Sequence, residues 1–289
     1  MRLKRLFRST NRRVRLLVGL MLVGLFLVHC TYSGADRTPG QFAVAIDGRQ
    51  IGASSDGVRD KIEQLAKTDH IALLEFCLER YDASYQDYTV TFLKQERIGG
   101  RAGEQQTVAV KFMESPFSVG MKWVKNPPRG DRVLYVEGKY GNQMLVRPSG
   151  LIARSLVPTA LRKPDGDDAL KSTLRPVNLF GFKRGMHSLL RVYREARQAG
   201  DLQQQFGGYA DVAGRQTLVL VRYLPNKPQY PAYLTKVYVD LDYLVPIMVE
   251  GFGWNGEEFL CRYVYTDLKF NLGLMEEDFR PEAFDLRPQ

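Results

Sequence analysis

Few residues of this 289-residue chain have the types and spacing that catalysis needs. Of its three histidines, His29 lies in an N-terminal leader, while His70 and His187 fall in segments with helical periodicity. An isolated histidine on a helix is more often structural or solvated than a general base. The sequence contains no G-x-S-x-G, H-E-x-x-H or G-x-x-x-x-G-K-[ST] motif. A hydrolase would therefore require His70 or His187 to approach a serine or an aspartate in the fold.

The acidic residues give only weak signals for a metal site or for acid–base chemistry. Segment 165–168 (DGDD) resembles part of a calcium loop, but it lacks the downstream glutamate that an EF-hand loop requires. A polar surface turn explains it better. Asp240 and Asp242 share one face of a predicted strand, and the turn that follows accounts for them. We therefore expect no enzymatic activity, no metal site and no cofactor.

Aromatic residues give a stronger functional signal than the ionisable ones. In residues 236–268 (KVYVDLDYLVPIMVEGFGWNGEEFLCRYVYTDL), apolar side chains occupy both alternating positions of the predicted strands. A sheet that is covered on one face should carry polar residues on the other. One interpretation is a two-layer core with aromatic residues at its rim. The other is a sheet that curls into a half-barrel, with helices closing over a cavity that binds an apolar ligand.

The second interpretation names the side chains expected to face this cavity. They are large and share the parity of the predicted inner face. The expected lining residues are Phe92, Phe112, Trp123, Tyr135, Phe252 and Trp254. The expected lid is an amphipathic helix that carries Met186, Leu189, Leu190 and Tyr193. Because a shift of one residue reverses the parity of a strand, each of these assignments depends on the register.

Periodicity and turn residues predict the elements that carry these side chains. Helical spacing covers 58–81, and Thr68 or Asp69 can begin a second helix there. Short strands follow, with turn residues between them and no helix. They are predicted over 87–98, 106–113, 117–124, 132–138 and 142–148, and again, after an irregular segment at 151–182 and the lid helix, over 206–214, 215–223 and 231–268. The order favours an α+β fold in which one curved antiparallel sheet, a half-barrel, has helices packed on its concave side.

The N-terminal segment has the composition of an export signal. Seven cations precede a 13-residue apolar run, Leu16 to Val28. This run is shorter than the roughly 20 residues of a membrane-spanning helix and matches the about 7–15 residues of a signal-peptide core. The small residues at 33–35 (SGA) are of the kind that a signal peptidase accepts at its cleavage site. The alternatives are cleaved export, an uncleaved membrane anchor at 16–28 and lipidation at Cys30; each places the protein in the periplasm or cell envelope.

Net charge argues against a nucleic-acid partner. The first 35 residues contribute seven positive charges and no acidic residue, so the rest of the chain carries +2 of the total of +9. This is too little for phosphate-backbone binding as a main activity. Segment 154–197 is nevertheless rich in arginine and lysine. It is typical of a solvated helix face, or alternatively of a surface attracted to anionic lipid head groups.

Composition also predicts the domain organisation. We expect a signal peptide or anchor at 1–35, a tether at 36–56 and one domain at 57–289. Without the leader, only Cys77 and Cys261 remain. They can form a disulfide in an oxidising compartment, or serve as two small buried apolar side chains, which is the interpretation we favour.

Several strand motifs resemble those of the DUF1571 family, over roughly residues 70 to 285. They are DYTVTFLKQERIGG, VKFMESPFSVGMKWVKNPPRGDRVLYVEGKYGNQMLVRPSG and YTDLKFNLGLMEEDF. That family is similar to the LolA/LolB-like superfamily of outer-membrane lipoprotein carriers, a similarity carried here by VYVDLDYLVPIMVEGFGWNG. The resemblance implies a LolA-like half-barrel of about eleven antiparallel strands with helices over an apolar cavity. In the carriers the cavity binds the acyl chains of lipoproteins, and a related sensor branch detects lipidated or misfolded envelope proteins. This chain departs from the carriers in its long middle insertion.

Two functions from different classes follow. The first is a non-enzymatic cell-envelope protein that binds lipid, or the acyl chains of an acylated protein, in the half-barrel. The alternative is an envelope protein-interaction or sensor module, in which the half-barrel is a filled core and the basic middle region contacts a protein partner.

Overall fold

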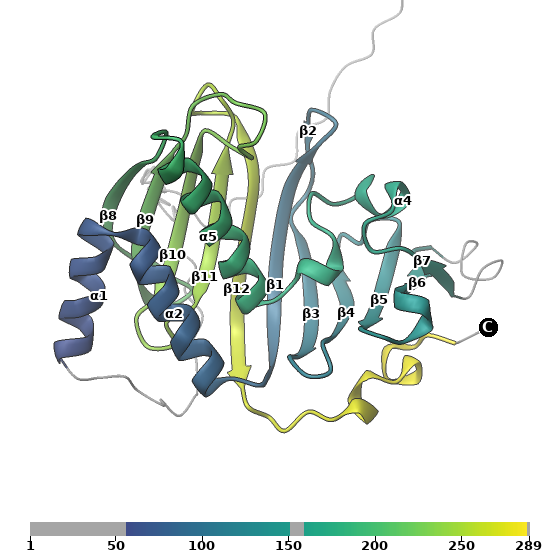
Figure 1. Ribbon diagram of the computed structural model, residues 1–289. Helices are drawn as coiled ribbons and strands as arrows, with labels where there is room; N and C mark the ends of the chain where they lie inside the picture. Colours follow the sequence, from purple (N-terminus) through teal and green to yellow (C-terminus); the bar gives the residue numbers. More distant parts are fainter. Residues whose placement is uncertain (1–55, 151–158, 288–289) are drawn as a thin grey trace, which may run out of the picture. The chain divides into compact units, whose positions relative to one another are not determined.

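Strands and helices occupy residues 56–150 and 159–287, the parts of the chain described by a computed structural model (Figure 1). All of these residues belong to the second of two compact units of the chain, Thr38–Gln289. The predictions for the leader at 1–35, for Cys30 and for nearly all of the tether at 36–56 lie outside the described residues. None of the helices in the described ranges is long and apolar enough to cross a membrane.

Two consecutive helices open the described chain, α1 (Asp56–Thr68) and α2 (His70–Ser84). Asp69 separates them in an extended conformation, and its carboxylate accepts hydrogen bonds from the backbone N–H groups of Ile71 and Ala72 at 3.0 and 3.2 Å. An aspartate in this position caps the otherwise unpaired N–H groups of the first helical turn. The prediction that a second helix begins here is confirmed.

Twelve strands form one open antiparallel sheet. They are β1 (Asp87–Ile98), β2 (Arg101–Ala102), β3 (Gln106–Met113), β4 (Ser118–Lys125), β5 (Gly130–Val136), β6 (Met144–Pro148), β7 (Ala160–Arg162), β8 (Gln203–Val212), β9 (Arg215–Tyr223), β10 (Leu234–Asp240), β11 (Pro246–Phe252) and β12 (Phe259–Phe270). Their order is β7-β6-β5-β4-β3-β1-β12-β11-β10-β9-β8, with β2 paired to β1. The predicted α+β half-barrel is confirmed.

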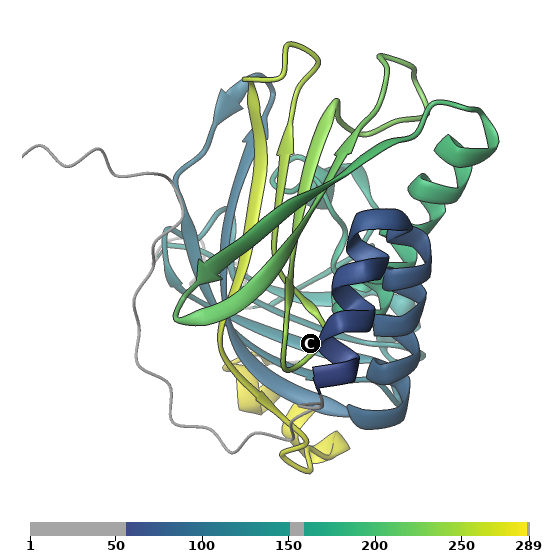
Figure 2. The same ribbon diagram turned by 90° about the vertical axis from the view of Figure 1, so that its left-hand side faces the viewer.

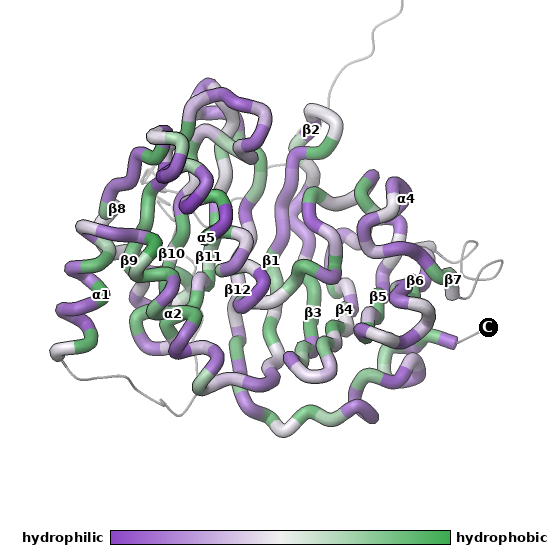
Figure 3. The backbone as a smooth tube through the Cα atoms, viewed as in Figure 1, coloured by the Kyte–Doolittle hydropathy of each residue, from purple (hydrophilic) through white to green (hydrophobic). Residues whose placement is uncertain are grey.

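The first and last long strands meet at the centre of the sheet. β1 pairs with β12, so that Phe92 lies opposite Tyr265, and with β3 on its other side. The sheet therefore has two halves, β3–β7 and β8–β12, which come from the two ends of the domain sequence. Figure 3 shows hydrophobic stretches along strands on both sides of β1.

The remaining helices all lie after β5 in the sequence. α5 (Phe182–Gln198) is the long one; the short ones are α4 (Asp167–Leu170) and the 3-10 turns η1 (Tyr140–Asn142), η2 (Val177–Leu179), η3 (Glu276–Phe279) and η4 (Pro281–Phe284). Figures 1 and 2 show α1, α2 and α5 on the same face of the curved sheet. This face is called the inner face below. The core beneath α2 and α5 includes Leu74, Met186, Leu220 and Val237, each fully buried.

The opposite, outer face is also covered over β4–β6. The C-terminal turns η3 and η4 pack there in a separate apolar cluster of Met113, Leu134, Val136, Leu145, Phe279, Phe284 and Leu286. Gly120 on β4 permits this packing, because a Cβ at that position would lie 1.9 Å from the ring of Phe284. Neighbouring strand residues point to opposite faces. On this half, apolar residues of both parities are therefore buried because both faces of the sheet have a cover.

Both cysteines of the described ranges are free thiols. Cys77 is buried in α2, and this burial raises the pKa of its thiol to about 12. Cys261 lies on β12 and is partly buried. The interpretation that each is a small apolar packing residue agrees with these positions.

Candidate ligand-binding cavity

A cavity of about 440 Å³ lies between the inner face of the sheet and the segment that joins β7 to α5. Its walls are mostly apolar side chains of β1, β3, β4, β5, β6, β11 and β12. The wall residues include Phe92, Val108, Met121, Trp123, Val133, Met144, Val146, Val249, Tyr263 and Tyr265. On β1, β4, β6 and β12 the lining residues are two positions apart, as Met121 and Trp123 are, because alternate residues of a strand share one face. On β5 and β11 a register shift interrupts this spacing.

The cover of the cavity is segment 160–181, which consists of β7 and the chain that joins it to α5; the sequence analysis predicted it as part of an irregular segment. Pro164, Pro176, Val177 and Phe180 line the cavity from this side. The ring of Phe180 packs edge-on against that of Phe92, with centroids 5.3 Å apart. The prolines prevent a long helix here. Apolar residues in a long segment without strand or helix periodicity are the sequence signal that marks such a cover.

The predicted lid helix, α5, contributes to the cavity with part of one face. Met186 and Leu189 line it. Leu190 and Tyr193 are buried, at 1% and 0% exposure, but belong to the core that α5 shares with α2 and the sheet. The helix therefore covers one end of the cavity and fills the neighbouring half of the inner face.

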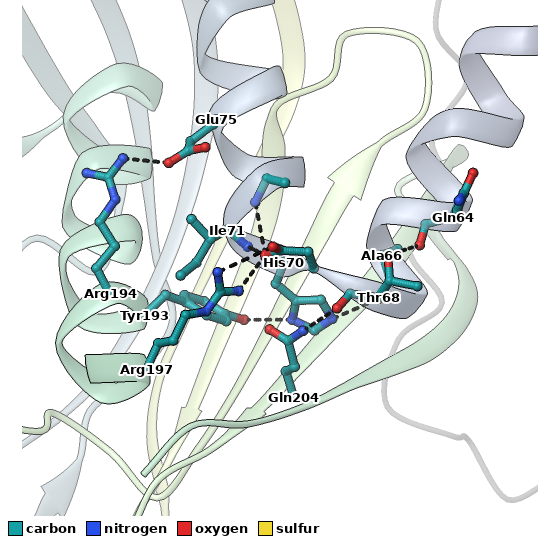
Figure 4. A network of polar contacts seen from close by, with 12 residues as sticks. Gln64, Ala66, Thr68, His70, Ile71, Glu75, Tyr193, Arg194, Arg197 and Gln204 are labelled. Carbon is teal, nitrogen blue, oxygen red and sulfur yellow. Dashed lines mark hydrogen bonds and ion pairs between the residues drawn. The ribbon is translucent and has the colours of Figure 1, made fainter. Parts of the chain in front are cut away.

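A polar network fixes α5 against α2 (Figure 4). The buried His70 ring bonds the Tyr193 hydroxyl through Nδ1 at 3.1 Å and the Ala66 carbonyl through Nε2 at 2.9 Å. Burial lowers the pKa of His70 to about 4, so the ring is neutral at neutral pH. The carbonyl requires a donor, which places the ring proton on Nε2 and makes Nδ1 the acceptor of the tyrosine proton. Two exposed ion pairs, Arg194–Glu75 and Arg197–Asp69, flank this network.

The predicted lining residues occupy three different environments. Phe92 and Trp123 line the cavity, and the Trp123 indole N–H donates to Gln106 at 2.8 Å. Phe112 and Tyr135 are buried on the inner face but do not line it. Phe112 stacks on Tyr88 with ring centroids 4.6 Å apart, and the backbone of Gly181 packs against its ring. Those contacts fill the space that the prediction assigned to a ligand.

Phe252 and Trp254 lie away from the cavity, contrary to their predicted place. On β11, Val249 lines the cavity and Phe252 follows three positions later, so alternation turns it to the other face. There Lys236 lies 5.7 Å from the Phe252 ring centroid. Trp254 is 38% exposed in the turn before β12. Pro246 also lines the cavity, and parity counted from it would turn Phe252 inward. The pairing of β10 with β11 shifts register between Met248 and Pro246, which reverses that parity.

Two charged residues of β1 also line the cavity, and sequence reasoning missed them. Lys94 and Glu96 are only 8% and 4% exposed, and their side chains pair at 3.1 Å. Lys94 donates to the Thr173 hydroxyl at 2.7 Å, while Glu96 accepts from the Tyr263 hydroxyl at 2.5 Å and from the Leu174 backbone N–H at 3.1 Å. Burial lowers the pKa of Lys94. The sequence did contain a signal for them, because Lys94 and Glu96 are two and four residues after Phe92 and so share its face of the strand.

The other polar groups singled out in the sequence have structural roles. Asp240 and Asp242 both pair with Arg215, and Asp240 accepts backbone N–H bonds from residues 242 and 243, which closes the turn between β10 and β11. Segment 165–168 leads into the short, surface-exposed α4. Within 56–150 and 159–287, no group of three or more histidine, cysteine or acidic side chains is placed to hold a metal ion.

The model of the family described as "Protein of unknown function (DUF1571)" matches residues 85–287. The chain belongs to the DUF1571 family. The matched span begins just after α2 and ends at the last described residue. Every residue that lines the cavity of this DUF1571 protein lies within the span, from Phe92 to Tyr265.

Several solved structures resemble this DUF1571 protein at low sequence identity. The Pseudomonas aeruginosa MucA/MucB complex matches with 16% identity and a TM-score of 0.45, over 76% of this chain and 63% of the other. LppX, a lipoprotein of Mycobacterium tuberculosis, matches with 13% identity and a TM-score of 0.41, over 71% and 96%. A LolA superfamily protein of Nitrosomonas europaea matches with 11% identity and a TM-score of 0.32, over 73% and 98%.

These similarities assign no function to this DUF1571 protein, because every TM-score quoted is below 0.5. The chain also spans less than two thirds of the MucB structures that it matches. Comparison with functionally curated proteins finds no match.

Proposed function

We propose that this DUF1571 protein is a non-enzymatic protein of the cell envelope that binds an acyl chain of a lipid or of an acylated protein. The observation that carries the proposal is the apolar cavity of about 440 Å³ under segment 160–181. Beneath α2 and α5, buried side chains of the helices and the sheet pack together in one apolar core. An unfilled apolar volume beside a filled core is the feature that a ligand would use.

The size and chemistry of the cavity support an acyl chain. Small-molecule pockets span about 300–1,000 Å³ and are lined mainly by apolar and aromatic groups. A methylene group is similar in volume to a water molecule, about 30 Å³, so the cavity holds roughly 15 such groups. This corresponds to one long chain. Each buried methylene contributes about 0.8 kcal/mol, so even partial insertion gives substantial affinity.

The envelope location in this proposal rests on the leader. Its cations and 13-residue apolar run are features of exported proteins, whether the leader is cleaved, retained or lipidated. The proposed partners are therefore a lipid or an acylated protein, with membrane association through residues 16–28 if the leader is retained. Nucleic acid is not among the proposed partners.

One observation favours the alternative, a protein-interaction or sensor module. The cover segment exposes Leu161, Leu170, Leu174 and Leu179, each 38–47% accessible. Exposed apolar groups gathered in one segment are typical of a surface that meets a partner. A partner protein at this segment would lie directly over the cavity, so the two functions are distinguished by what occupies the cavity.

Native mass spectrometry of the exported protein, purified without detergent, tests the proposal. We expect adducts that organic extraction identifies as fatty acid or phospholipid, or an apo protein that takes up added myristate. In the variant Val133→Trp the new side chain enters the cavity, and we expect affinity to fall by about tenfold or more. The matched control is Val124→Trp on β4, whose position is 72% exposed and outside the lining.

Two results would contradict the proposal. The first is an apo mass that added acyl ligands leave unchanged. The second is equal binding by the Val133→Trp and Val124→Trp proteins, provided that both unfold cooperatively. Either result would favour the protein-interaction module.

A further inference from the structure

Most cations of the basic middle segment are already paired within the protein. On α5, Lys183 pairs with Asp82, Arg184 with Glu137, Arg191 with Glu195, Arg194 with Glu75 and Arg197 with Asp69; on the cover, Lys171 pairs with Asp168. Arg162, Lys163 and Arg175 have no carboxylate within ion-pair distance in 56–150 and 159–287. Arg162 and Arg175 line the cavity. The unpaired positive charge of this segment therefore gathers on the cover.

The charged residues that line the cavity also include more cations than carboxylates. Four cations, Lys94, Arg129, Arg162 and Arg175, and two carboxylates, Glu96 and Asp168, belong to the lining. Both carboxylates already have cationic partners, Lys94 and Lys171. The three arginines are exposed, whereas the apolar wall residues are buried or partly buried, so the unpaired charge lies at the mouth. A cavity lined by low-dielectric walls and unpaired cations concentrates anions.

Of these arginines, Arg175 is the one best positioned to bind an anion, because the two residues before it are hydrogen-bonded to the buried pair Lys94–Glu96. Leu174 donates its N–H to Glu96, and Thr173 accepts from Lys94. Thr173 and Arg175 also exchange hydrogen bonds at 3.0 and 3.3 Å. The guanidinium lies 5.6 Å from the centroid of the Tyr263 ring, which forms part of the cavity wall. A planar guanidinium at this position presents a fork of donors that matches a carboxylate or a phosphate.

We infer that the ligand is a single-chain amphiphile with an anionic head group. Its acyl chain fills the apolar cavity, and its carboxylate or phosphate is bound at the mouth by Arg175, with Arg162 and Arg129 adding positive potential. This inference rests on the proposed function and narrows it. A neutral acyl group, such as one attached to a protein through an ester or amide, lacks the charge that these arginines recognise.

Calorimetry with three probes of one chain length tests the inference. The probes are myristate, tetradecanol and monomyristoyl lysophosphatidate, each below its critical micelle concentration. We expect myristate, the lysophosphatidate or both to bind about tenfold or more tightly than tetradecanol, as for hydrogen bonds to charged groups. The tighter of the two acids shows whether the site prefers a carboxylate or a phosphate.

Two variants assign the effect to Arg175. In Arg175→Gln we expect the preference for the anionic probe to fall about tenfold, with tetradecanol binding unchanged. In Arg175→Lys part of the preference should return, and added salt should weaken it. The control, Lys163→Gln, removes a cation of the cover that neither lines the cavity nor pairs with one of its carboxylates in 56–150 and 159–287.

The outcomes separate this inference from the proposed function. Equal binding of all three probes would overturn the anionic head group while leaving acyl-chain binding intact. An unchanged preference in Arg175→Gln would overturn the assignment to Arg175. Failure of every probe to bind would overturn the proposed function itself.

Discussion

The two halves of the inner face are built from similar apolar residues, yet one is filled and the other is open. Beneath α2 and α5, Leu220 and Val237 lie in continuous core. Beneath segment 160–181, Met121 and Val133 are also buried but border a cavity. The walls of the two halves therefore do not explain the difference. The covers do.

The covers differ in regularity. A helix places an apolar side chain every three or four residues along one face, so it fills the space above a sheet evenly. The cover segment carries prolines and only two short helical turns, α4 and η2, so it cannot do so. Because most of the cover has no regular secondary structure, its backbone N–H groups need other acceptors. The Glu96 carboxylate is the acceptor for the N–H of Leu174. A cavity thus remains where an irregular chain replaces a helix over an otherwise ordinary sheet.

Truncating one buried residue in each half should show the largest difference in stability. Leu74→Ala in the filled half removes a fully buried side chain and should lower the free energy of unfolding by about 2–5 kcal/mol. Met121→Ala borders free volume on one side, so it should cost less, about 1–2 kcal/mol. Urea unfolding of both variants measures the difference. Equal losses would mean that the cavity is as well packed as the core.

Acid should act on the filled half through His70. Burial is the main cause that lowers its folded pKa from 6.5 to about 4. The unfolded chain therefore binds a proton near pH 6.5 that the folded protein does not bind until near pH 4. Stability is complete above pH 6.5 and falls as the pH decreases, by about 3 kcal/mol at pH 4.

Unfolding free energies measured between pH 7 and 4 check this dependence. In His70→Gln the decrease over this range should be smaller by the same amount. A decrease that is unchanged in the variant would assign the acid sensitivity to other groups and would leave the contact between α5 and α2 independent of pH.

The cover of the outer face can be tested at Gly120. An added Cβ would lie 1.9 Å from the Phe284 ring, so Gly120→Ala should destabilise the protein by about 1–3 kcal/mol through overpacking. Combining it with Phe284→Ala should cost less than the sum of the single changes, because the clash is then removed. Gly57→Ala, where the added atom meets nothing within 4 Å, is the control. Additive losses would contradict the contact.

The smallest effect is expected for the ion pairs that flank the lid helix. Arg194 and Glu75 pair at 2.7 Å, but their side chains are 58% and 47% exposed. Such pairs contribute about 0–1 kcal/mol, so Arg194→Gln should change the thermal midpoint only slightly. A larger loss would mean that α5 is held by surface charge and not by its buried face.

Much of the local structure could be predicted from the sequence. The strand predicted over 87–98 is β1 and the one over 106–113 is β3, because alternation and flanking turn residues act locally. Thr68 and Asp69 were the two predicted caps of a second helix, and Asp69 is the one that caps it; a cap depends on only a few adjacent residues. Membership of the DUF1571 family followed from strand motifs of the same kind.

The tertiary structure decided what local pattern cannot. Parity placed Phe92 and Trp123 at the cavity, but contacts from Tyr88 and Gly181 filled the space around Phe112, and alternation from Val249 turned Phe252 away. The pairing of β1 with β12 and the closing of segment 160–181 over Lys94 and Glu96 join residues about 80 to 180 positions apart. Alternation is a property of one strand, whereas a cavity depends on which distant segment covers it and how completely that segment fills the space.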